Sequence, residues 1–516
     1  MTEPSSRPNI LFICSDQHTP RVTGCYGDDI VDTPHLDALA AEGARFDAFY
    51  CNNPICGPSR SSFFTGRYSY RAECVHNFHV LDSRLPTLAH VAVRGGYNPV
   101  LSGKMHFNGP DQTHGFLERL VGEMGASPIL QGDPVRAPGL QNLGNCSRPD
   151  CMYHTGPGQN HEVPYDEDVT RTTVEWLHRW AEQEERPPFF FMAGYLQPHN
   201  PFIIQRELYD KYAGRVSAPR YPRAYLDGLH PHHRDYRKVI EIDQVPEENW
   251  DRAVPTYYGM VDQLDQQIGK LIAALKETGQ WDNTIIIYTS DHGEMLGQHG
   301  RWHKECFRED SARVPLIVRD PRRPQPRVVS GTHTMVDLMP TLCEWTGVTP
   351  PPGLDGVSLE PALAGTETEA PPALCETYTH WTEDKHGMSS NRMVRQGAWK
   401  LCYYGAYDSY ELFNLESDPE EMDNLAEKPE HAAKLEELKP MIFSGGWSRR
   451  IHDELIAKLN ARGELDNNQG YRDALNQSLR KYPREIDYLG MWPGSRTTPT
   501  TLDADEDAPL EAVKVT

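Results

Sequence analysis

The segment Asn9-Ile-Leu-Phe-Ile-Cys-Ser15 is a short apolar run that ends directly in the polar cluster Asp16-Gln17-His18. A continuous apolar run of this length is typical of a strand buried on both faces, as in a parallel sheet. Three later segments have the same design, an apolar run followed by polar side chains. They are residues 97–101 before Lys104 and His106, residues 189–193 before Gln197 and His199, and residues 284–289 before Asp291 and His292.

Helical patterns lie between these apolar runs. Residues 33–43, 166–185 and 257–278 carry apolar side chains at helical spacing. Strands that alternate with helices predict an α/β fold, in which ligands gather beyond the carboxyl ends of the strands. All four polar clusters follow such ends, so we expect them to meet in one site.

From about residue 371 the pattern changes to short strands separated by turn residues. Strands are expected at residues 391–397, 399–404 and 410–415, followed by an acidic helix after Ser417-Asp-Pro419. This pattern predicts a small α+β subdomain that contains an antiparallel sheet. We therefore expect a larger α/β domain over residues 1–375 and a smaller unit over residues 376–516. The long C-terminal extension of the smaller unit is a candidate for homo-oligomer contacts.

The chain has 516 residues, too many for one compact core, and 51 Lys and Arg against 74 Asp and Glu leave a formal net charge of −23. Such an acidic protein is a poor partner for nucleic acid and for anionic membranes, which attract basic patches. The eleven cysteines are scattered and odd in number, which argues against a disulfide framework. No apolar segment is long enough for a signal sequence or a membrane span, so a cytoplasmic protein with reduced thiols is expected.

The segment Cys56-Gly-Pro-Ser-Arg60 predicts the start of a short helix, because Pro58 suits a first helical turn. Cys56 then lies at the helix N-terminus, where free backbone N–H groups and the helix dipole favour negative charge. Arg60 lies one turn further on and adds a guanidinium suited to a tetrahedral oxyanion. The functional interpretation is a nucleophile inside an anion-binding cradle. The alternative is a buried cysteine beside a helix start, which is the commoner case for such a residue taken alone.

Four residues at two strand ends form a candidate metal site: Asp16, Gln17, Asp291 and His292. Two carboxylates, an amide oxygen and an imidazole suit Ca²⁺, Mg²⁺ or Mn²⁺ better than a soft metal. The alternative is that the two Asp residues cap helices or turns, and for either pair alone this is the better interpretation. Their joint occurrence with the Cys56 segment favours the metal site.

Four cationic or titratable side chains are candidates for contacts with an anionic substrate. Lys104 can neutralise a substrate oxygen, and His106, two residues later, can move a proton. His199 lies between Pro198 and Asn200-Pro201, a stiff turn that would hold its direction. Lys304 either faces the same pocket or is a solvated loop charge. For any one of these histidines alone, a surface or structural role is the commoner one.

Together these motifs resemble the sulfatase family of the alkaline phosphatase superfamily. The resemblance is carried by Cys56-Gly-Pro-Ser-Arg60 with Thr65-Gly-Arg67, Gly103-Lys-Met-His106, Pro198-His199, Ser290-Asp-His-Gly-Glu294, Arg313-Val-Pro315 and Trp399-Lys-Leu401, and it extends over most of residues 9 to 430. It implies a large mixed, mostly parallel sheet between helices, with a smaller C-terminal α+β subdomain.

The resemblance also implies a chemistry. Cys56 would be oxidised after translation by a formylglycine-generating enzyme, and the hydrate of the resulting formylglycine would be the nucleophile. One hydroxyl would attack sulfur, and loss of the proton of the second would expel sulfate by collapse to the aldehyde. The implied roles are metal ligation by Asp16, Gln17, Asp291, His292 and modified Cys56, orientation of the nucleophile by Arg60, sulfate binding by Lys104, proton transfer by His106, assistance of the leaving oxygen by His199 and Lys304, and a further substrate contact by Asn77.

Two pairs depart from the pattern of many sulfatases, which carry paired Asp residues and later Asp-Asn. Here the pairs are Asp16-Gln17 and Asp291-His292, similar to those of the phosphonate monoester hydrolase branch. Ca²⁺ is expected, with Mn²⁺ or Mg²⁺ as alternatives. Because Lys104-Met-His106 resembles the sulfatase pair, we expect a hydrolase of a small anionic sulfate ester. The alternatives are a phosphonate monoester or phosphate diester hydrolase on the same site, and a catalytically silent anion-binding protein with an unmodified Cys56.

Overall fold

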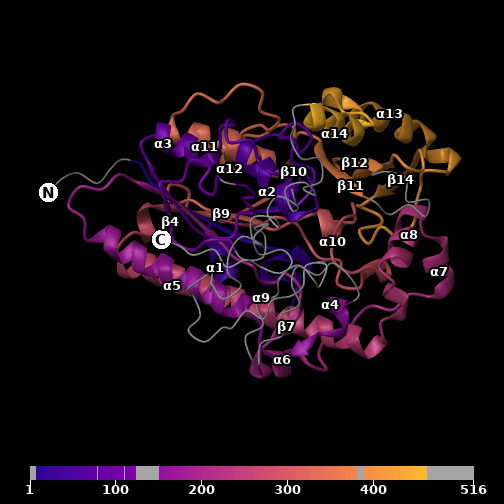
Figure 1. The fold of residues 1–516 in the computed structure, drawn as a ribbon, viewed down its shortest axis with the longest axis horizontal. Coiled ribbons are helices and arrows are strands. Elements are labelled where there is room, and N and C mark those ends of the chain that lie inside the picture. The colour runs from indigo at the N-terminus through magenta and orange to yellow at the C-terminus, as the bar shows by residue number, and fades with distance from the viewer. Residues whose placement is uncertain (1–6, 78, 110, 124–149, 380–388, 462–516) are drawn as a thin grey trace, which may run out of the picture.

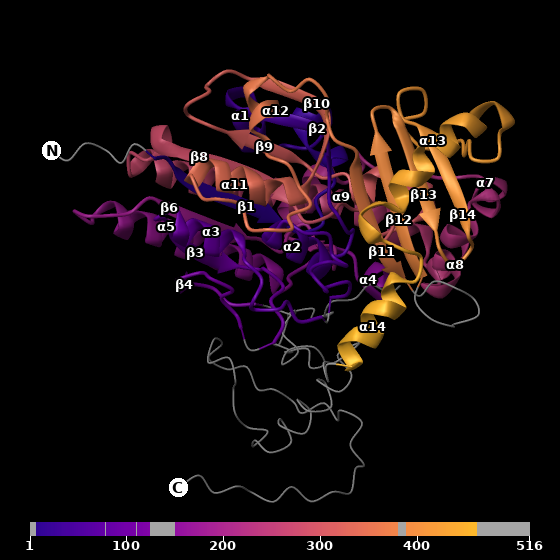
Figure 2. The ribbon, with the colours of Figure 1, turned by 90° about the horizontal axis from the view of Figure 1, so that it is seen from above.

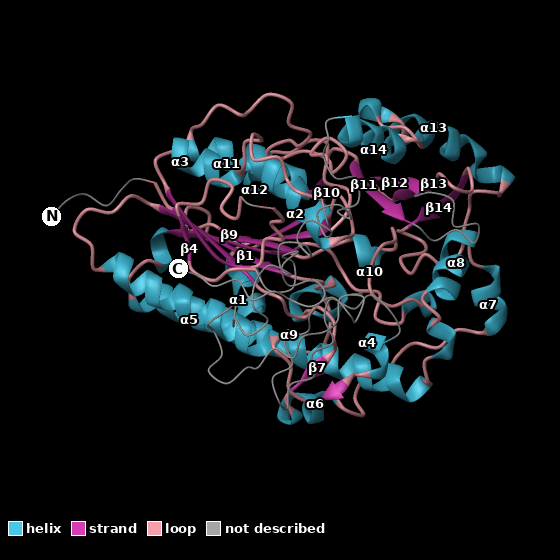
Figure 3. Cartoon of the chain, viewed as in Figure 1, coloured by secondary structure: helices cyan, strands magenta, loops and turns pink. Residues whose placement is uncertain are grey.

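The computed structural model describes residues 7–77, 79–109, 111–123, 150–379 and 389–461. Figure 1 shows two regions, a large sheet between helices and a smaller sheet beneath the helices of the C-terminal part. Figure 2 shows the two sheets side by side from above, and Figure 3 shows helices on both sides of the large sheet. The expected α/β fold with a C-terminal antiparallel sheet is confirmed.

The large sheet has eight strands in the order β10-β2-β9-β8-β1-β6-β3-β4. Their bounds are β1 Asn9–Ser15, β2 Ala44–Tyr50, β3 Asn98–Gly103, β4 Glu118–Arg119, β6 Phe189–Gly194, β8 Thr284–Ser290, β9 Leu316–Arg319 and β10 Arg327–Thr334. Only β9 runs antiparallel to its neighbours β2 and β8. The four predicted strands therefore form the adjacent parallel core β8-β1-β6-β3, and their apolar side chains are buried on both faces.

Two layers of helices cover this sheet, and each layer closes its own hydrophobic cluster. On one side lie α2 Cys56–Thr65, α3 Leu88–Arg94, α11 Leu338–Thr346 and α12 Glu360–Ala364; on the other lie α1 Pro34–Glu42, α5 Glu162–Ala181 and α9 Glu247–Glu277. Successive side chains of β1 alternate between the clusters, since Ile10 and Phe12 join the first and Leu11 and Ile13 the second. The central strand is thus held from both sides.

The smaller sheet is antiparallel, in the order β11-β12-β13-β14. Its strands are β11 Ala373–Thr379, β12 Ser389–Gln396, β13 Trp399–Tyr404 and β14 Ser409–Asn414. Met393 and Cys402 join the core of the large domain, whereas Val394 and Leu401 pack with α13 Ala432–Ile442. The sheet is therefore buried on both faces and ties α13 and α14 Ile451–Ala461 to the large domain. Residues 462–516 of the predicted extension, with the expected homo-oligomer contact, lie outside the described residues.

The structure differs from the expectations in several local elements. No helix directly follows Ser417-Asp-Pro419, because the Asp418 carboxylate accepts from the backbone N–H groups of Met422 and Asp423 and holds a turn there. Helix α9 begins ten residues earlier than expected and contains Pro255, and α5 begins at Glu162. Strands β2 and β10 were not predicted, since both are partly exposed and lack a continuous apolar run.

The remaining elements lie in connections. They are α4 Asp150–Tyr153, β5 Gly156–Pro157, β7 Ile203–Ile204, α6 Arg206–Tyr212, α7 Arg223–Gly228, α8 Pro231–Val239 and α10 Glu309–Ala312. Within the described part of the chain, no helix combines the length and the apolar character needed to cross a bilayer.

Candidate active site

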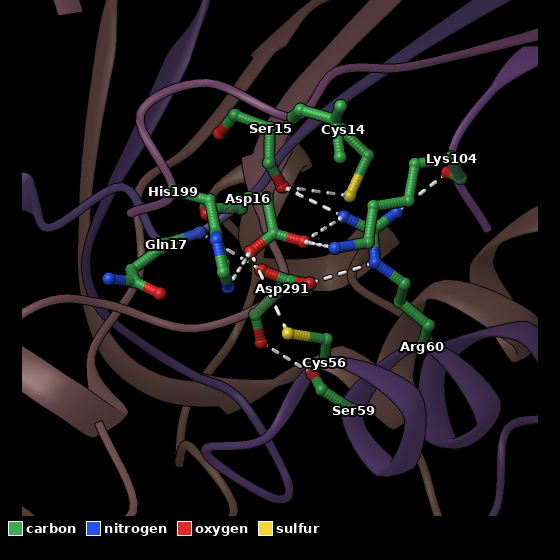
Figure 4. Close-up of polar contacts among 12 residues, drawn as sticks. Cys14, Ser15, Asp16, Gln17, Cys56, Ser59, Arg60, Lys104, His199 and Asp291 are labelled. Atoms are coloured by element: carbon green, nitrogen blue, oxygen red, sulfur yellow. Dashed lines mark hydrogen bonds and ion pairs between the residues drawn. The ribbon is translucent and has the colours of Figure 1, made fainter. Parts of the chain in front are cut away.

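The register of the parallel core brings the polar clusters to one edge of the sheet. Ser15 pairs with Ser290 at the ends of β1 and β8, so Asp16 and Asp291 follow at the same level. Gly194 at the end of β6 pairs with Gly103 at the end of β3, directly before Lys104. Figure 4 shows the side chains that follow these ends gathered around Cys56. The expected convergence beyond the carboxyl ends of the strands is thus present in the structure.

Cys56 is the first residue of α2 and is 1% exposed. Its Sγ lies 3.1 Å from His292 Nε2, 3.7 Å from Asp16 Oδ1 and 3.7 Å from Lys304 Nζ. The N-cap Ile55 supplies no side-chain cap, and the N–H of Gly57 instead donates to Asn77 Oδ1 at 2.9 Å. Burial, followed by the nearby Asp16 carboxylate, raises the pKa of the Cys56 thiol to about 11.

Arg60 links both strand-end carboxylates. Its Nε donates to Asp291 Oδ2 at 2.8 Å, its Nη2 to Asp16 Oδ2 at 3.1 Å, and its Nη1 to the backbone oxygen of Lys104 at 2.8 Å. Lys104 Nζ lies 2.8 Å from the same Asp16 Oδ2. Burial by itself would raise the pKa of Asp16, but Lys104, His199 and Arg60 hold it well below its usual range. The buried carboxylate is therefore ionised.

Four side chains could hold a metal ion. Ligand atoms of Asp16, Cys56, Asp291 and His292 all lie within 4.8 Å of one another, and all four residues are buried. The His292 ring donates from Nδ1 to the carbonyl of Gly293 at 3.0 Å, which leaves the lone pair of Nε2 facing the cluster. Burial lowers the pKa of His292 and keeps the imidazole neutral. A neutral imidazole beside two carboxylates is a donor set that fits a divalent cation.

Lys304 and His199 form a pair beside Cys56. Lys304 Nζ donates to His199 Nε2 at 2.7 Å and to Gln17 Oε1 at 2.5 Å. The His199 ring in turn donates from Nδ1 to the carbonyl of Asn200 at 2.5 Å. Burial, and then the positive charge of Lys304, hold the pKa of His199 well below its usual value. Lys304 thus faces the site and is not a solvated loop charge.

His106 is oriented by its backbone and by its neighbour Asn77. Its Nε2 donates to the Asn77 carbonyl at 2.9 Å, whereas its buried Nδ1 has no hydrogen-bond partner among the residues that the structure describes. Burial and Lys104 lower the pKa of this ring to about 3, so that it is a neutral base with a free lone pair. The backbone of His106 is left-handed, with φ 63°, as is that of Gln17, with φ 66°. Such conformations are uncommon outside glycine and cluster at functional sites.

Several residues that support the site escaped the sequence reasoning. The Glu123 carboxylate accepts from the N–H groups of Met105 and Phe107 and so shapes the loop that carries Lys104 and His106. Asp166 does the same for Leu196 and Gln197 before His199. The hydroxyls of Ser59 and Tyr257 hold the backbone oxygens of Asp291 and Gln17. Two supporting residues had a sequence signal, Ser59 in Cys56-Gly-Pro-Ser-Arg60 and Glu294 as the last residue of Ser290-Asp-His-Gly-Glu294.

All predicted site residues lie at this edge, and Asn77 also makes hydrogen bonds to the backbone and side chains around Cys56. Its side-chain oxygen holds the start of α2, and its carbonyl holds His106 and Asn108. These bonds make it part of the frame around Cys56. The expected substrate contact of Asn77, like the catalytic roles of the other residues, stays a prediction.

Comparisons with known proteins agree with this geometry. Residues 8–348 match the family described as Sulfatase, and residues 297–444 match the C-terminal region of N-sulphoglucosamine sulphohydrolase. The choline-sulfatase of Rhizobium meliloti is 33% identical over 484 residues, which cover 89% of this chain and 90% of that protein. The N-acetylglucosamine-6-O-sulfatase of Bacteroides thetaiotaomicron is 26% identical over 502 residues, which cover 85% and 86%.

Solved structures give the same result. The phosphonate monoester hydrolase of Agrobacterium radiobacter is similar with a TM-score of 0.70 and 26% sequence identity, over 85% of this chain and 95% of that chain. This neighbour is named a phosphonate monoester hydrolase, and it is to this branch that the pairs Asp16-Gln17 and Asp291-His292 were found similar. On the family match, the relatives and the fold together, the chain belongs to the sulfatase family of the alkaline phosphatase superfamily.

Proposed function

We propose that this protein hydrolyses a small sulfate monoester, with the hydrate of a formylglycine derived from Cys56 as the nucleophile. The observation that carries the proposal is the group of charged and titratable side chains around Cys56 Sγ. Within the described residues, two carboxylates, a neutral imidazole and Lys304 lie next to this sulfur, and Arg60 and Lys104 lie behind them. The family membership and the sulfatase relatives support the same reaction class.

An unmodified thiol would serve this reaction poorly. Burial raises the pKa of the Cys56 thiol and so disfavours the thiolate that would have to attack. An aldehyde hydrate differs because it carries a second hydroxyl group, and loss of the proton of that group expels sulfate without attack of water on a covalent ester. We therefore propose that maturation requires a formylglycine-generating enzyme.

We propose that a divalent metal is held by Asp16, Asp291 and His292, with the oxygen of modified Cys56 and the amide oxygen of Gln17. When bound, the metal supplies Lewis acidity and positive charge beside the nucleophile. Ca²⁺ is our first choice, with Mn²⁺ and Mg²⁺ as alternatives, because the donors are mainly hard oxygens.

The chain's own residues would then act as follows. One hydroxyl of the hydrate would give its proton to the neighbouring Asp291 carboxylate, and its oxygen would bond to sulfur while the bond from sulfur to the alcohol oxygen breaks. Arg60 would orient the nucleophile and balance its charge, and Lys104 would balance the charge of the sulfuryl oxygens. The Lys304–His199 pair places a proton donor on the Cys56 side of the site, where the leaving oxygen needs a proton. His106 Nδ1 accepts the proton of the second hydroxyl, and collapse to the aldehyde releases sulfate.

The second candidate is a phosphonate monoester or phosphate diester hydrolase. Gln17 and His292 favour it, because they stand where the phosphonate monoester hydrolase branch has similar residues. The structural similarity to a phosphonate monoester hydrolase supports the same candidate. Against it stands the pair Lys104 and His106, which resembles the pair of the sulfatases; the Lys104 ammonium lies 2.8 Å from Asp16 Oδ2 in the site.

The test has two parts. Mass spectrometry of the peptide that contains Cys56, from a host able to make formylglycine, should show the aldehyde. Finding only thiol there would support the catalytically silent alternative. The ratio of kcat/KM for an aryl sulfate and an aryl phosphonate, measured on one preparation, should favour the sulfate, and a large preference for the phosphonate would favour the second candidate.

A further inference from the structure

Glu294 lies directly behind Gln17 and is fully buried. One of its carboxylate oxygens, Oε1, accepts from the backbone N–H groups of His303 at 2.7 Å and Leu296 at 2.8 Å. The other oxygen, Oε2, accepts from Gln17 Nε2 at 2.5 Å. The carboxylate therefore joins Gln17 to the loop that leads to Lys304.

The hydrogen-bond partners of Gln17 show where the oxygen and where the nitrogen of its side-chain amide lie. Its Nε2 meets two acceptors, Glu294 Oε2 and Asn200 Oδ1, the latter at 3.1 Å. Its Oε1 meets Lys304 Nζ at 2.5 Å, and an ammonium group can only donate. A flipped amide would set its NH₂ group against that ammonium and its oxygen against a carboxylate. The carbonyl oxygen of Gln17 is thus turned to the side of the site on which Lys304 and Cys56 lie.

We propose that Glu294 is a positioning residue, which holds the Gln17 amide so that its carbonyl oxygen, and not its nitrogen, is presented to a metal ion. The inference rests on the proposed function, because it takes Gln17 to be a metal ligand. It also explains why residue 17 is an amide in this chain. A carboxylate at position 17 would stand 2.5 Å from another carboxylate in a site without solvent.

The decisive variant is Glu294→Gln. The two backbone N–H groups require an acceptor, so the carbonyl oxygen of the introduced amide keeps the place of Oε1 and its NH₂ group faces Gln17. Two NH₂ groups then meet, and the Gln17 amide must flip and turn its nitrogen to the metal. We expect the affinity for Mn²⁺ and Ca²⁺ to fall about tenfold or more, the usual effect of removing a partner that orients a metal ligand.

The double variant Gln17→Glu with Glu294→Gln tests the reasoning by rescue. A carboxylate at position 17 accepts from the NH₂ group of the amide introduced at position 294 and presents its other oxygen to Lys304. The Asn200 amide, which now accepts from Gln17, turns its NH₂ group to the new carboxylate and gives up the contact with Cys151 Sγ. The single variant Gln17→Glu should lower the melting temperature of the metal-free protein, because two buried carboxylates then face each other. The matched control is Glu376→Gln, a fully buried Glu that accepts from Ser69 and the Tyr70 N–H and contacts none of the proposed ligands.

The measurement is isothermal titration calorimetry of the full-length, chelator-treated protein with MnCl₂ and with CaCl₂. Reduced affinity in Glu294→Gln, recovery in the double variant and no change in Glu376→Gln support the proposal. Wild-type affinity in a folded Glu294→Gln variant overturns it, and so does a double variant that binds no better than Glu294→Gln. If Glu294→Gln does not fold, the double variant decides, because folding and metal binding restored together support the proposal and their absence overturns it. A wild-type protein that binds neither ion contradicts the metal in the proposed function instead.

Discussion

The substitution Arg60→Lys keeps the positive charge but removes the geometry that joins the two strand-end carboxylates. The guanidinium makes its three shorter hydrogen bonds to Asp291, to Asp16 and to the backbone oxygen of Lys104, and a longer one of 3.4 Å to the backbone oxygen of Ser15. One ammonium group cannot reach all three acceptors, because Arg presents a planar fork and Lys a single point. We therefore expect the variant to lose two hydrogen bonds to buried acceptors.

The magnitude follows from the contacts. A hydrogen bond to a charged group contributes about 1.5–3 kcal/mol, so two of them amount to about 3–6 kcal/mol. Asp16 keeps Lys104 Nζ at 2.8 Å, which places our expectation at the lower end, a loss of about 3 kcal/mol in the free energy of unfolding. That is a large part of the stability of a typical domain.

The assay is urea unfolding followed by circular dichroism, in the presence of a chelator so that metal binding does not contribute. Arg171→Lys is the matched control, since its side chain is 57% exposed and pairs with Asp168 and Glu175 on the surface. It should change the free energy of unfolding by less than about 1 kcal/mol. If the free energy of unfolding of the Arg60→Lys variant lies within about 1 kcal/mol of the wild-type value, the reasoning is refuted. If such a variant were also inactive, Arg60 would act on the substrate rather than on the frame.

Three further outcomes are expected. Lys104→Ala should lower kcat/KM for an aryl sulfate about 10²–10³-fold, because it removes a group that stabilises charge in the transition state. An unchanged kcat/KM would contradict the sulfate-binding role of Lys104. The second outcome concerns the dependence of stability on pH. Burial would raise the pKa of Glu411, but Arg308 and His233 hold it well below its usual range. The stability that this carboxylate contributes should therefore be present above about pH 4 and be lost as the pH falls through the lowered pKa. Glu411→Gln should therefore lose less stability than wild type in urea unfolding between pH 5 and pH 3, roughly the range in which carboxylates titrate, and parallel curves would contradict this. Removal of divalent metal by a chelator should lower the melting temperature. Metal added at about 100 times its Kd should restore about 2.7 kcal/mol of the free energy of unfolding. A melting temperature that does not respond to metal would argue against the proposed site.

Much of the site could be predicted from the sequence, because its residues follow strands with a strong signal. Strands β1, β3, β6 and β8 are buried on both faces and read as continuous apolar runs, which place Asp16, Lys104, His199 and Asp291 at strand ends. Strands β2 and β10 gave no such signal. Val328 of β10 is 58% exposed, and the first residues of β2 alternate between buried and half-buried. The sequence pattern of neither strand therefore differs clearly from that of a loop or of part of a helix.

The supporting carboxylates could not be predicted, because their partners are distant in the chain. Glu294 lies 277 positions from Gln17, and Asp166 acts on backbone N–H groups 30 and 31 positions away. Glu294 belongs to a segment of the family resemblance, but no local signal distinguishes a surface charge from such a contact, either for Glu294 or for Asp166. The role of Asn77 at the start of α2 depends on tertiary contact in the same way.

The sequence by itself determined the α/β class and the strand ends at which the polar clusters lie, and its family motifs pointed to Cys56 as the central residue. These follow from periodicity and from the residue types at short spacing, which are local properties of the chain. Only the tertiary structure decided which side chains meet. It showed that Arg60 joins two strand ends, that Lys304 faces the site and that Glu294 accepts a hydrogen bond from Gln17. The physical reason is that hydrogen bonds and charges act over a few ångströms in space, whatever the separation along the sequence.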